Sequence, residues 1–161
     1  MSTSYAMEKR SYKITCSLKE GYAPEGKLFG IDKVANVIKE WMEQRLKTRQ
    51  PLVTGLLQQG SLFFPSVSED EPSAITISPT AIFTGELSSS EDMQRPDEEV
   101  KYTLELLAQN MKDELKQESV FIIYRNENWC VWEDHAFIRL SAKHHLQTLR
   151  IALKSDKSIN G

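Results

Sequence analysis

The residues best suited to chemistry lie close together near the end of the sequence, in NENWCVWEDH at positions 126–135. Trp132, Glu133, Asp134 and His135 follow one another there. A tryptophan beside ionisable groups is typical of a pocket or a partner surface, because its ring joins an apolar body to a polar edge. Trp132 and His135 are therefore candidate ligand- or partner-binding residues. The alternative is a packed hairpin whose aromatic side chains seal the edge of the core.

A nucleophilic role for Cys130, with His135 as its base, is a third interpretation of the same segment. Positions 130 and 135 point to opposite faces of a strand, because successive side chains alternate. The sequence also offers no third group to orient a base and no evident oxyanion hole. We therefore nominate no catalytic residue, and whether the protein is an enzyme stays open at this point.

Carboxylates and histidines in the same region raise the question of a metal site, since zinc accepts both kinds of ligand. The candidates are Glu133, Asp134, His135, His144 and His145. Neighbouring histidines on a helix point about 100° apart, so the last two do not readily reach one ion. No HxH or HxxxH pair occurs. We expect neither a metal nor another cofactor.

The segment SAKHHLQTLRIALK, at 141–154, predicts a C-terminal helix with a basic stripe. Ser141 suits the N-cap position, and an apolar stripe runs beside the basic one. Lys143 and Arg150 belong to the basic stripe, and basic residues outnumber acids from 139 to 157. A solvated helix face explains this pattern. The functional alternative is a docking stripe for an acidic partner, a phosphate-bearing ligand or RNA, with Lys143 and Arg150 as its contact residues.

Hydrophobic periodicity predicts the elements that must position these residues. The predicted strands cover 12–18, 52–64, 74–87 and 119–124, and the predicted amphipathic helices cover 31–48 and 97–117. The strand over 52–64 is apolar on both alternating faces, which indicates burial on both sides. The order strand, helix, strand, strand, helix, strand is the ferredoxin-like split βαβ pattern. It predicts an α+β fold with an antiparallel sheet and two helices on one of its faces.

A C-terminal hairpin and helix, over 125–154, extend this βαββαβ core of residues 10–124. In the hairpin, Trp129 points to the opposite face from Trp132, because the two positions differ in parity. We expect the whole chain, 1–161, to be a single domain, since its length suits one hydrophobic core. The polar, patternless ends at 1–9 and 155–161 are expected to fray.

Composition limits the classes of function that the chain can serve. Lys and Arg number 20 against 23 Asp and Glu, giving a net charge of −3. Without a global positive field, nucleic-acid binding by the whole surface is not expected. No apolar run approaches the ~20 residues of a membrane span, so we expect a cytoplasmic protein without a membrane anchor. Cys16 and Cys130 lie far apart and match no metal-ligand spacing, which favours free thiols in a reducing compartment.

The sheet face opposite the helices determines the function that we expect. The first strand places Lys13, Thr15 and Ser17 on that face, whereas the strands over 52–64 and 119–124 must place apolar residues there. An exposed apolar surface of this kind is an association site. Either the C-terminal segment or a second copy of the chain is expected to cover it.

We therefore expect a small cytosolic binding or interaction protein, and a homo-oligomer. Its site would lie between the sheet and the C-terminal segment, with Arg125 and Trp132 among its residues, and would take a small anionic ligand or an acidic partner. The first alternative is a small ferredoxin-like enzyme acting on a small anionic substrate in the same place. The second is an RNA- or acidic-partner-docking module that uses the basic C-terminal helix.

Overall fold

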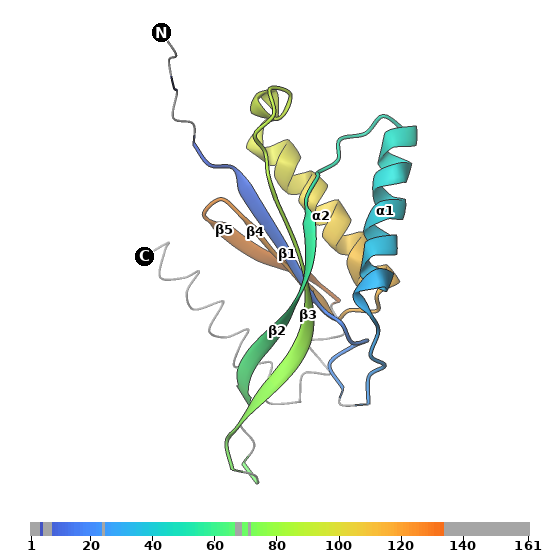
Figure 1. The fold of residues 1–161 in the computed structure, drawn as a ribbon, viewed down its shortest axis with the longest axis vertical. Coiled ribbons are helices and arrows are strands. Elements are labelled where there is room, and N and C mark those ends of the chain that lie inside the picture. The colour runs from blue at the N-terminus through green and yellow to red at the C-terminus, as the bar shows by residue number, and fades with distance from the viewer. Residues whose placement is uncertain (1–3, 5–7, 24, 67–68, 71, 134–161) are drawn as a thin grey trace. The chain divides into compact units, whose positions relative to one another are not determined.

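The computed structural model describes residues 4, 8–23, 25–66, 69–70 and 72–133 (Figure 1). Its elements, in chain order, are β1 (Ser11–Ser17), α1 (Ile31–Lys47), β2 (Leu56–Ser66), β3 (Ala74–Glu86), the short 3-10 helix η1 (Asp92–Gln94), α2 (Asp97–Glu114), β4 (Ser119–Tyr124) and β5 (Glu127–Trp132). The predicted helix over 141–154 and the chain end at 155–161 lie outside the described residues. So do the candidate site residues His135, Lys143 and Arg150.

The strands form a five-stranded sheet in the order β2-β3-β1-β4-β5. β1 runs antiparallel to both of its neighbours, β3 and β4, and β4 runs antiparallel to β5. Each helix joins two strands that are separated by a third, since α1 links β1 to β2 across β3, and α2 links β3 to β4 across β1. This is the split βαβ arrangement. The predicted ferredoxin-like α+β fold is confirmed, and β5 extends it as the predicted hairpin partner of β4.

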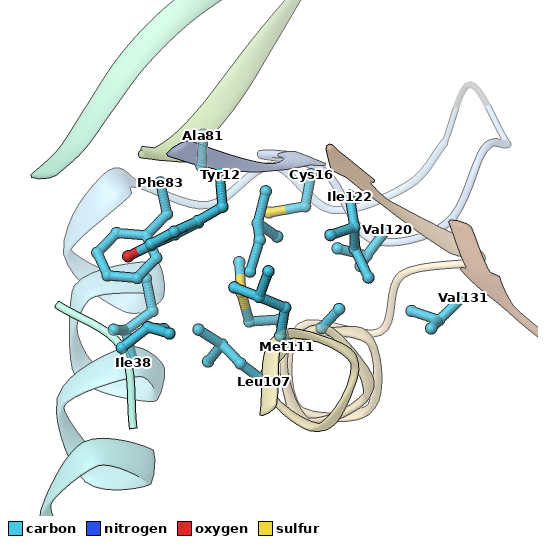
Figure 2. Close-up of a cluster of buried hydrophobic side chains, with 14 of the residues drawn as sticks. Tyr12, Cys16, Ile38, Ala81, Phe83, Leu107, Met111, Val120, Ile122 and Val131 are labelled. Atoms are coloured by element: carbon cyan, nitrogen blue, oxygen red, sulfur yellow. The ribbon is translucent and has the colours of Figure 1, made fainter. Parts of the chain in front are cut away.

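Both helices lie on the same side of the sheet (Figure 1) and form the core with it. Figure 2 shows Ile38 of α1 together with Leu107 and Met111 of α2 pointing toward side chains of the sheet. Tyr12 and Ile122 are among those sheet residues, and both are almost fully buried. The apolar stripe of each helix therefore meets the alternate side chains of the strands, as the two periodicities require.

The ends of α2 show which local signals set its length. Pro96 is the N-cap residue, and Asp97, Glu98 and Glu99 occupy the first turn, where the positive end of the helix dipole favours acids. The helix ends at Glu114, three residues before the predicted end at position 117. The cause is Lys116, whose φ of 52° lies in the left-handed region and cannot continue a helix.

The prediction of a doubly buried strand over 52–64 was wrong in two respects. β2 begins only at Leu56, and the chain before it packs closely against its surroundings: a Cβ at Gly55 would crowd the carbonyl oxygen of Thr84 and the hydroxyl of Tyr12. β2 is also an edge strand, and its apolar side chains are largely exposed, including Phe63 at 64%. An apolar run on both faces therefore does not show burial when the strand lies at the edge of a sheet.

Residue contacts divide the chain into two compact units. The first comprises Met1–Gly60 with Pro79–Trp132, and it contains both helices and the hydrophobic core. The second comprises Ser61–Ser78 with Glu133–Gly161. In the described part of the second unit, the second half of β2 and the start of β3 carry exposed apolar side chains: Leu62, Phe63, Ile75 and Ile77. No helix within the described residues is long and apolar enough to cross a membrane.

Candidate functional site

The sheet face opposite the helices, which we call the second face, is defined by alternation along β1. Ile14 and Cys16 are buried in the core, so Lys13, Thr15 and Ser17 point to the second face. These polar residues were expected there from the sequence. Their neighbours on β3, β4 and β5 follow from the strand register, and all of the residues concerned belong to the first unit.

The register arranges the second face as rows that run across β3, β1, β4 and β5 in that order. The lysine row is Thr84, Lys13, Ile123 and Asn128; the central row is Ile82, Thr15, Phe121 and Cys130; and the hydroxyl row is Thr80, Ser17, Ser119 and Trp132. The β1–β4 pairs end at Thr15 and Phe121, and the same register continued by two residues places Ser17 opposite Ser119. The face therefore changes from basic to apolar to hydroxyl-rich along the strands.

The hydroxyl row brings small alcohol side chains together beside an aromatic ring. Thr80 is paired with Ser17, and Ser119 is paired with Trp132. Thr80 and Ser119 are 6% and 7% exposed, whereas Trp132 is 37% exposed. Buried hydroxyls beside a partly exposed indole can donate and accept hydrogen bonds while the ring contacts an apolar or aromatic group.

β4 contributes two apolar side chains to the second face, Phe121 in the central row and Ile123 in the lysine row. Phe121 and Ile123 are 41% and 39% exposed, while Val120 and Ile122, which alternate with them, are fully buried in the core. The prediction that the strand over 119–124 would place apolar residues on the second face is confirmed. Flat, partly exposed aromatic surface of this kind is suited to stacking on a ring or to contact with a cation.

Lys13 supplies a positive charge at the other end of the same face. It is exposed, and its neighbours in the lysine row are Thr84 on β3 and Ile123 on β4. Lys13 and Ser17 lie on the same strand, about 13 Å apart at roughly 3.3 Å per residue. The second face therefore offers a cation and a hydroxyl group at opposite ends of an apolar strip.

Cys130, the cysteine on this face, is poorly suited to act as a nucleophile. Burial raises the pKa of its thiol to about 11, so the thiolate is scarce at neutral pH. Its proposed base, His135, lies outside the described residues. Cys130 and Cys16 are both free, and within the described residues no group of three His, Cys, Asp or Glu side chains could hold a metal ion.

Arg125, a predicted binding residue, belongs to a different part of the first unit. It lies in the turn between β4 and β5, and its guanidinium donates to Asp97 Oδ2 at 2.8 Å and pairs with Glu8. The hydroxyl of Tyr124 donates to Asp97 Oδ1 at 2.6 Å and accepts from Arg10 Nε at 3.0 Å. We call these residues (Glu8, Arg10, Asp97, Tyr124 and Arg125) the Asp97 cluster.

The contacts of the Asp97 cluster indicate a structural role. Arg10 also donates to the backbone carbonyls of Asp92 and Arg95, at 2.8 and 2.7 Å, so it ties β1 to the chain that enters α2. The hydrogen bond from Tyr124, together with the charges of Arg125 and Arg10, lowers the pKa of the Asp97 carboxyl group. Charge-assisted hydrogen bonds of this kind hold the start of α2 against β1 and β4.

Two of the predicted binding residues, Trp132 and Arg125, lie within the described part of the chain, at opposite ends of the β4–β5 hairpin. Trp132 lies on the second face at the open end of the hairpin, and Arg125 lies in its turn. Sequence reasoning missed Ser119 and Thr80. Both could have been found by pairing the predicted strands, because Ser119 starts the strand whose alternate residues, Phe121 and Ile123, point to the second face.

Comparison with known proteins gives a fold and no family. No protein-family model matches the sequence, and no curated protein matches it either. Two solved structures are similar in fold. One is a phage SAM lyase in complex with S-methyl-5'-thioadenosine, with 12% sequence identity and a TM-score of 0.54 over 83% of this chain and 97% of that chain. The other is a phage SAM lyase in the apo state, with 14% identity and a TM-score of 0.55 over 83% of this chain and 98% of that one.

At this level of identity the likeness shows the fold alone. The βαββαβ sheet with its added strand is therefore an architecture that is also used by a lyase of a small molecule, and one of the two similar chains holds a nucleoside thioether. A function for this chain has to be argued from its own residues.

Proposed function

We propose that this protein binds S-adenosylmethionine on the second face of its sheet and cleaves it to S-methyl-5'-thioadenosine. The observation that carries the proposal is the arrangement of the second face, where a hydroxyl row beside Trp132, an apolar strip and Lys13 follow one another. The substrate has the same succession of chemistry: an adenosine, a sulfonium centre and an amino-acid tail. The fold likeness to phage SAM lyases supports the choice of this substrate.

The dimensions of the face are consistent with one ligand molecule lying along β1. The hydroxyl row would hydrogen-bond the sugar, and the ring of Trp132 would contact the adenine. Phe121, in the central row, would lie beside the positive sulfonium, which an aromatic face attracts. The ammonium of Lys13 would pair with the carboxylate of the tail. The approximate 13 Å between Lys13 and Ser17 is a span that a nucleoside with an amino-acid tail can bridge.

The reaction that suits such a face requires orientation and no acid–base group. If the carboxylate oxygen of the tail attacks its own γ-carbon, a C–O bond forms, the C–S bond breaks and its electron pair neutralises the sulfonium. The products are a lactone and S-methyl-5'-thioadenosine, and no proton is transferred. Holding the tail in the attacking geometry contributes to the rate by removing conformational freedom. Lys13 would fix the carboxylate for this step.

Chromatography tests this function directly. The full chain is incubated with S-adenosylmethionine, and the amount of S-methyl-5'-thioadenosine is followed over time against a sample without protein. Product formation above that background is the expected result, and Phe121→Ala should reduce it by about tenfold or more. Tyr102→Ala is the matched control, because Tyr102 is an aromatic residue with 63% exposure on α2. It should leave product formation unchanged.

Binding without turnover is the principal alternative, and the same samples distinguish it. If calorimetry detects S-methyl-5'-thioadenosine binding that Phe121→Ala weakens, but no product forms, the protein is a binding module and the lyase assignment is wrong. If neither nucleoside binds, the whole proposal is wrong. Native mass spectrometry of the same preparation would report the number of subunits, so it also tests the predicted homo-oligomer.

A further inference from the structure

A buried hydroxyl group on the second face has no hydrogen-bond partner. Ser119 is 7% exposed, and its Oγ is the buried side-chain polar atom without a partner in the part of the chain that the structure describes. Buried polar atoms are nearly always paired, so an exception calls for an explanation. Its position in the hydroxyl row, opposite Trp132 and on the same face as Phe121, places the unpaired group within the proposed ligand site.

Gln117, two residues earlier, shows that this region of the chain otherwise satisfies its buried polar groups. Its Nε2 donates to the carbonyl oxygens of Lys19 and Leu115, at 2.9 and 3.1 Å, and its Oε1 accepts from the backbone N–H of Ser17 at 3.0 Å. The side chain of Gln117 is therefore fully used in holding the end of β1. The hydroxyl of Ser119 has no comparable structural contact.

We propose that Ser119 is a specificity-determining residue whose hydroxyl binds a sugar hydroxyl of the ligand, so that the site selects a ribonucleoside over the deoxy form. This inference rests on the proposed function and goes beyond it by naming the group that recognises the sugar. A hydroxyl can both donate and accept, which matches a sugar hydroxyl with the same capacity. A ligand that lacks that hydroxyl leaves Ser119 unpaired, so discrimination follows from the polar group left buried in the complex.

Calorimetric titration of the full chain tests the assignment. The probes are S-methyl-5'-thioadenosine and its 2'-deoxy and 3'-deoxy analogues. For the wild-type protein, one deoxy analogue should bind roughly 3- to 10-fold more weakly than the ribonucleoside, the range expected for one hydrogen bond. In Ser119→Ala the ribonucleoside should weaken to the same extent, and its affinity should become equal to that of the discriminated analogue.

Two controls separate recognition from structure. Thr84→Val alters another hydroxyl on the same face, in the lysine row, and should keep the discrimination. Ser119→Ala should unfold at the same denaturant concentration as the wild type or a higher one, because it removes a buried group that has no partner. A clear loss of stability would show a structural role for the hydroxyl and overturn the assignment.

The outcomes also separate this inference from the proposed function. Tight binding of all three nucleosides with equal affinity, or discrimination that survives in Ser119→Ala, overturns the role of Ser119 and leaves nucleoside binding intact. Failure of the wild-type protein to bind S-methyl-5'-thioadenosine overturns the role of Ser119, and failure to bind S-adenosylmethionine as well overturns the proposed function too. Discrimination that disappears only in Ser119→Ala supports the role of Ser119 and nucleoside binding on the second face, and the chromatographic assay tests cleavage separately.

Discussion

Tyr124→Phe removes the hydroxyl at the centre of the Asp97 cluster without changing the shape of the core. The side chain of Tyr124 is fully buried, and its hydroxyl makes two hydrogen bonds to charged groups, one with Asp97 and one with Arg10. Hydrogen bonds to charged groups contribute about 1.5–3 kcal/mol each. Asp97 is 39% exposed and keeps its contact with Arg10 at 3.2 Å, so part of this energy is recovered after the mutation. We expect a total loss of about 1.5–3 kcal/mol in the free energy of unfolding.

Tyr12→Phe is the matched comparison, because Tyr12 is also a buried tyrosine with a bonded hydroxyl. Its hydroxyl donates a single hydrogen bond of 2.6 Å to the carbonyl oxygen of Thr54, a neutral acceptor. Thr54 is an exposed residue, so water can solvate its carbonyl once the hydroxyl is gone. The expected loss is therefore about 0.5–1.5 kcal/mol, smaller than for Tyr124→Phe.

Urea unfolding followed by circular dichroism measures both variants under the same conditions. The ordering of the two losses is the decisive result, since both mutations remove the same atom from the same residue type. If Tyr124→Phe costs no more than Tyr12→Phe, the charged partners add nothing. The structural role assigned to the Asp97 cluster is then wrong.

The remaining predictions concern pH and two glycines. The pKa of Asp97 is lowered in the folded state, so its stabilisation is present above the unfolded pKa of about 3.9 and is lost as the pH falls through the folded value. Between pH 6 and pH 3, the wild type should therefore lose more stability than Asp97→Asn in urea unfolding, and equal losses would contradict this. Gly85→Ala should lower the free energy of unfolding by about 1–3 kcal/mol, because the new Cβ would meet the carbonyl oxygen of Thr54. An unchanged free energy of unfolding would show that the segments around Gly85 and Thr54 move apart easily. Gly30→Ser should raise the free energy of unfolding by about 0.5–1 kcal/mol, because Gly30 is the N-cap of α1 and has no capping hydrogen bond, and a Cβ there would enter open space. A lower free energy of unfolding would contradict the cap geometry.

The fold could be predicted because local periodicity and element order agree. The helix over 31–48 has an apolar stripe that only a core can satisfy, and alternation over 12–18 fixes which side chains of that strand enter it. The strand over 52–64 could not be predicted correctly by the same reasoning. Its apolar residues carry no information on whether a neighbouring strand lies on one side or on both, and that depends on the sheet order.

The candidate site could be predicted only in part, for a related reason. Trp132 was identified by its residue type, and Thr15 and Ser17 by their parity, which are both local signals. Ser119 and Thr80 carry no such signal, because a serine or threonine at the end of a strand is common in any protein. They become candidates only when the register brings them into one row with Ser17 and Trp132. The register depends on how two strands pair, and it cannot be read from a single sequence.

Hydrogen bonding distinguishes the Asp97 cluster, a structural site, from the hydroxyl row, which we propose as part of a binding site. Asp97 accepts from Tyr124, Arg10 and Arg125, so its charge is balanced within the protein and a ligand would have to break existing bonds. Ser119 lies on β4, at the opposite end of that strand from Tyr124, and its hydroxyl has no hydrogen-bond partner within the described residues. A polar group that is buried without a partner destabilises the unliganded protein. A ligand that supplies the missing hydrogen bond removes this penalty, which strengthens its binding. For this reason the second face is the better place to look for the chemistry of this protein, although the Asp97 cluster has the stronger charges.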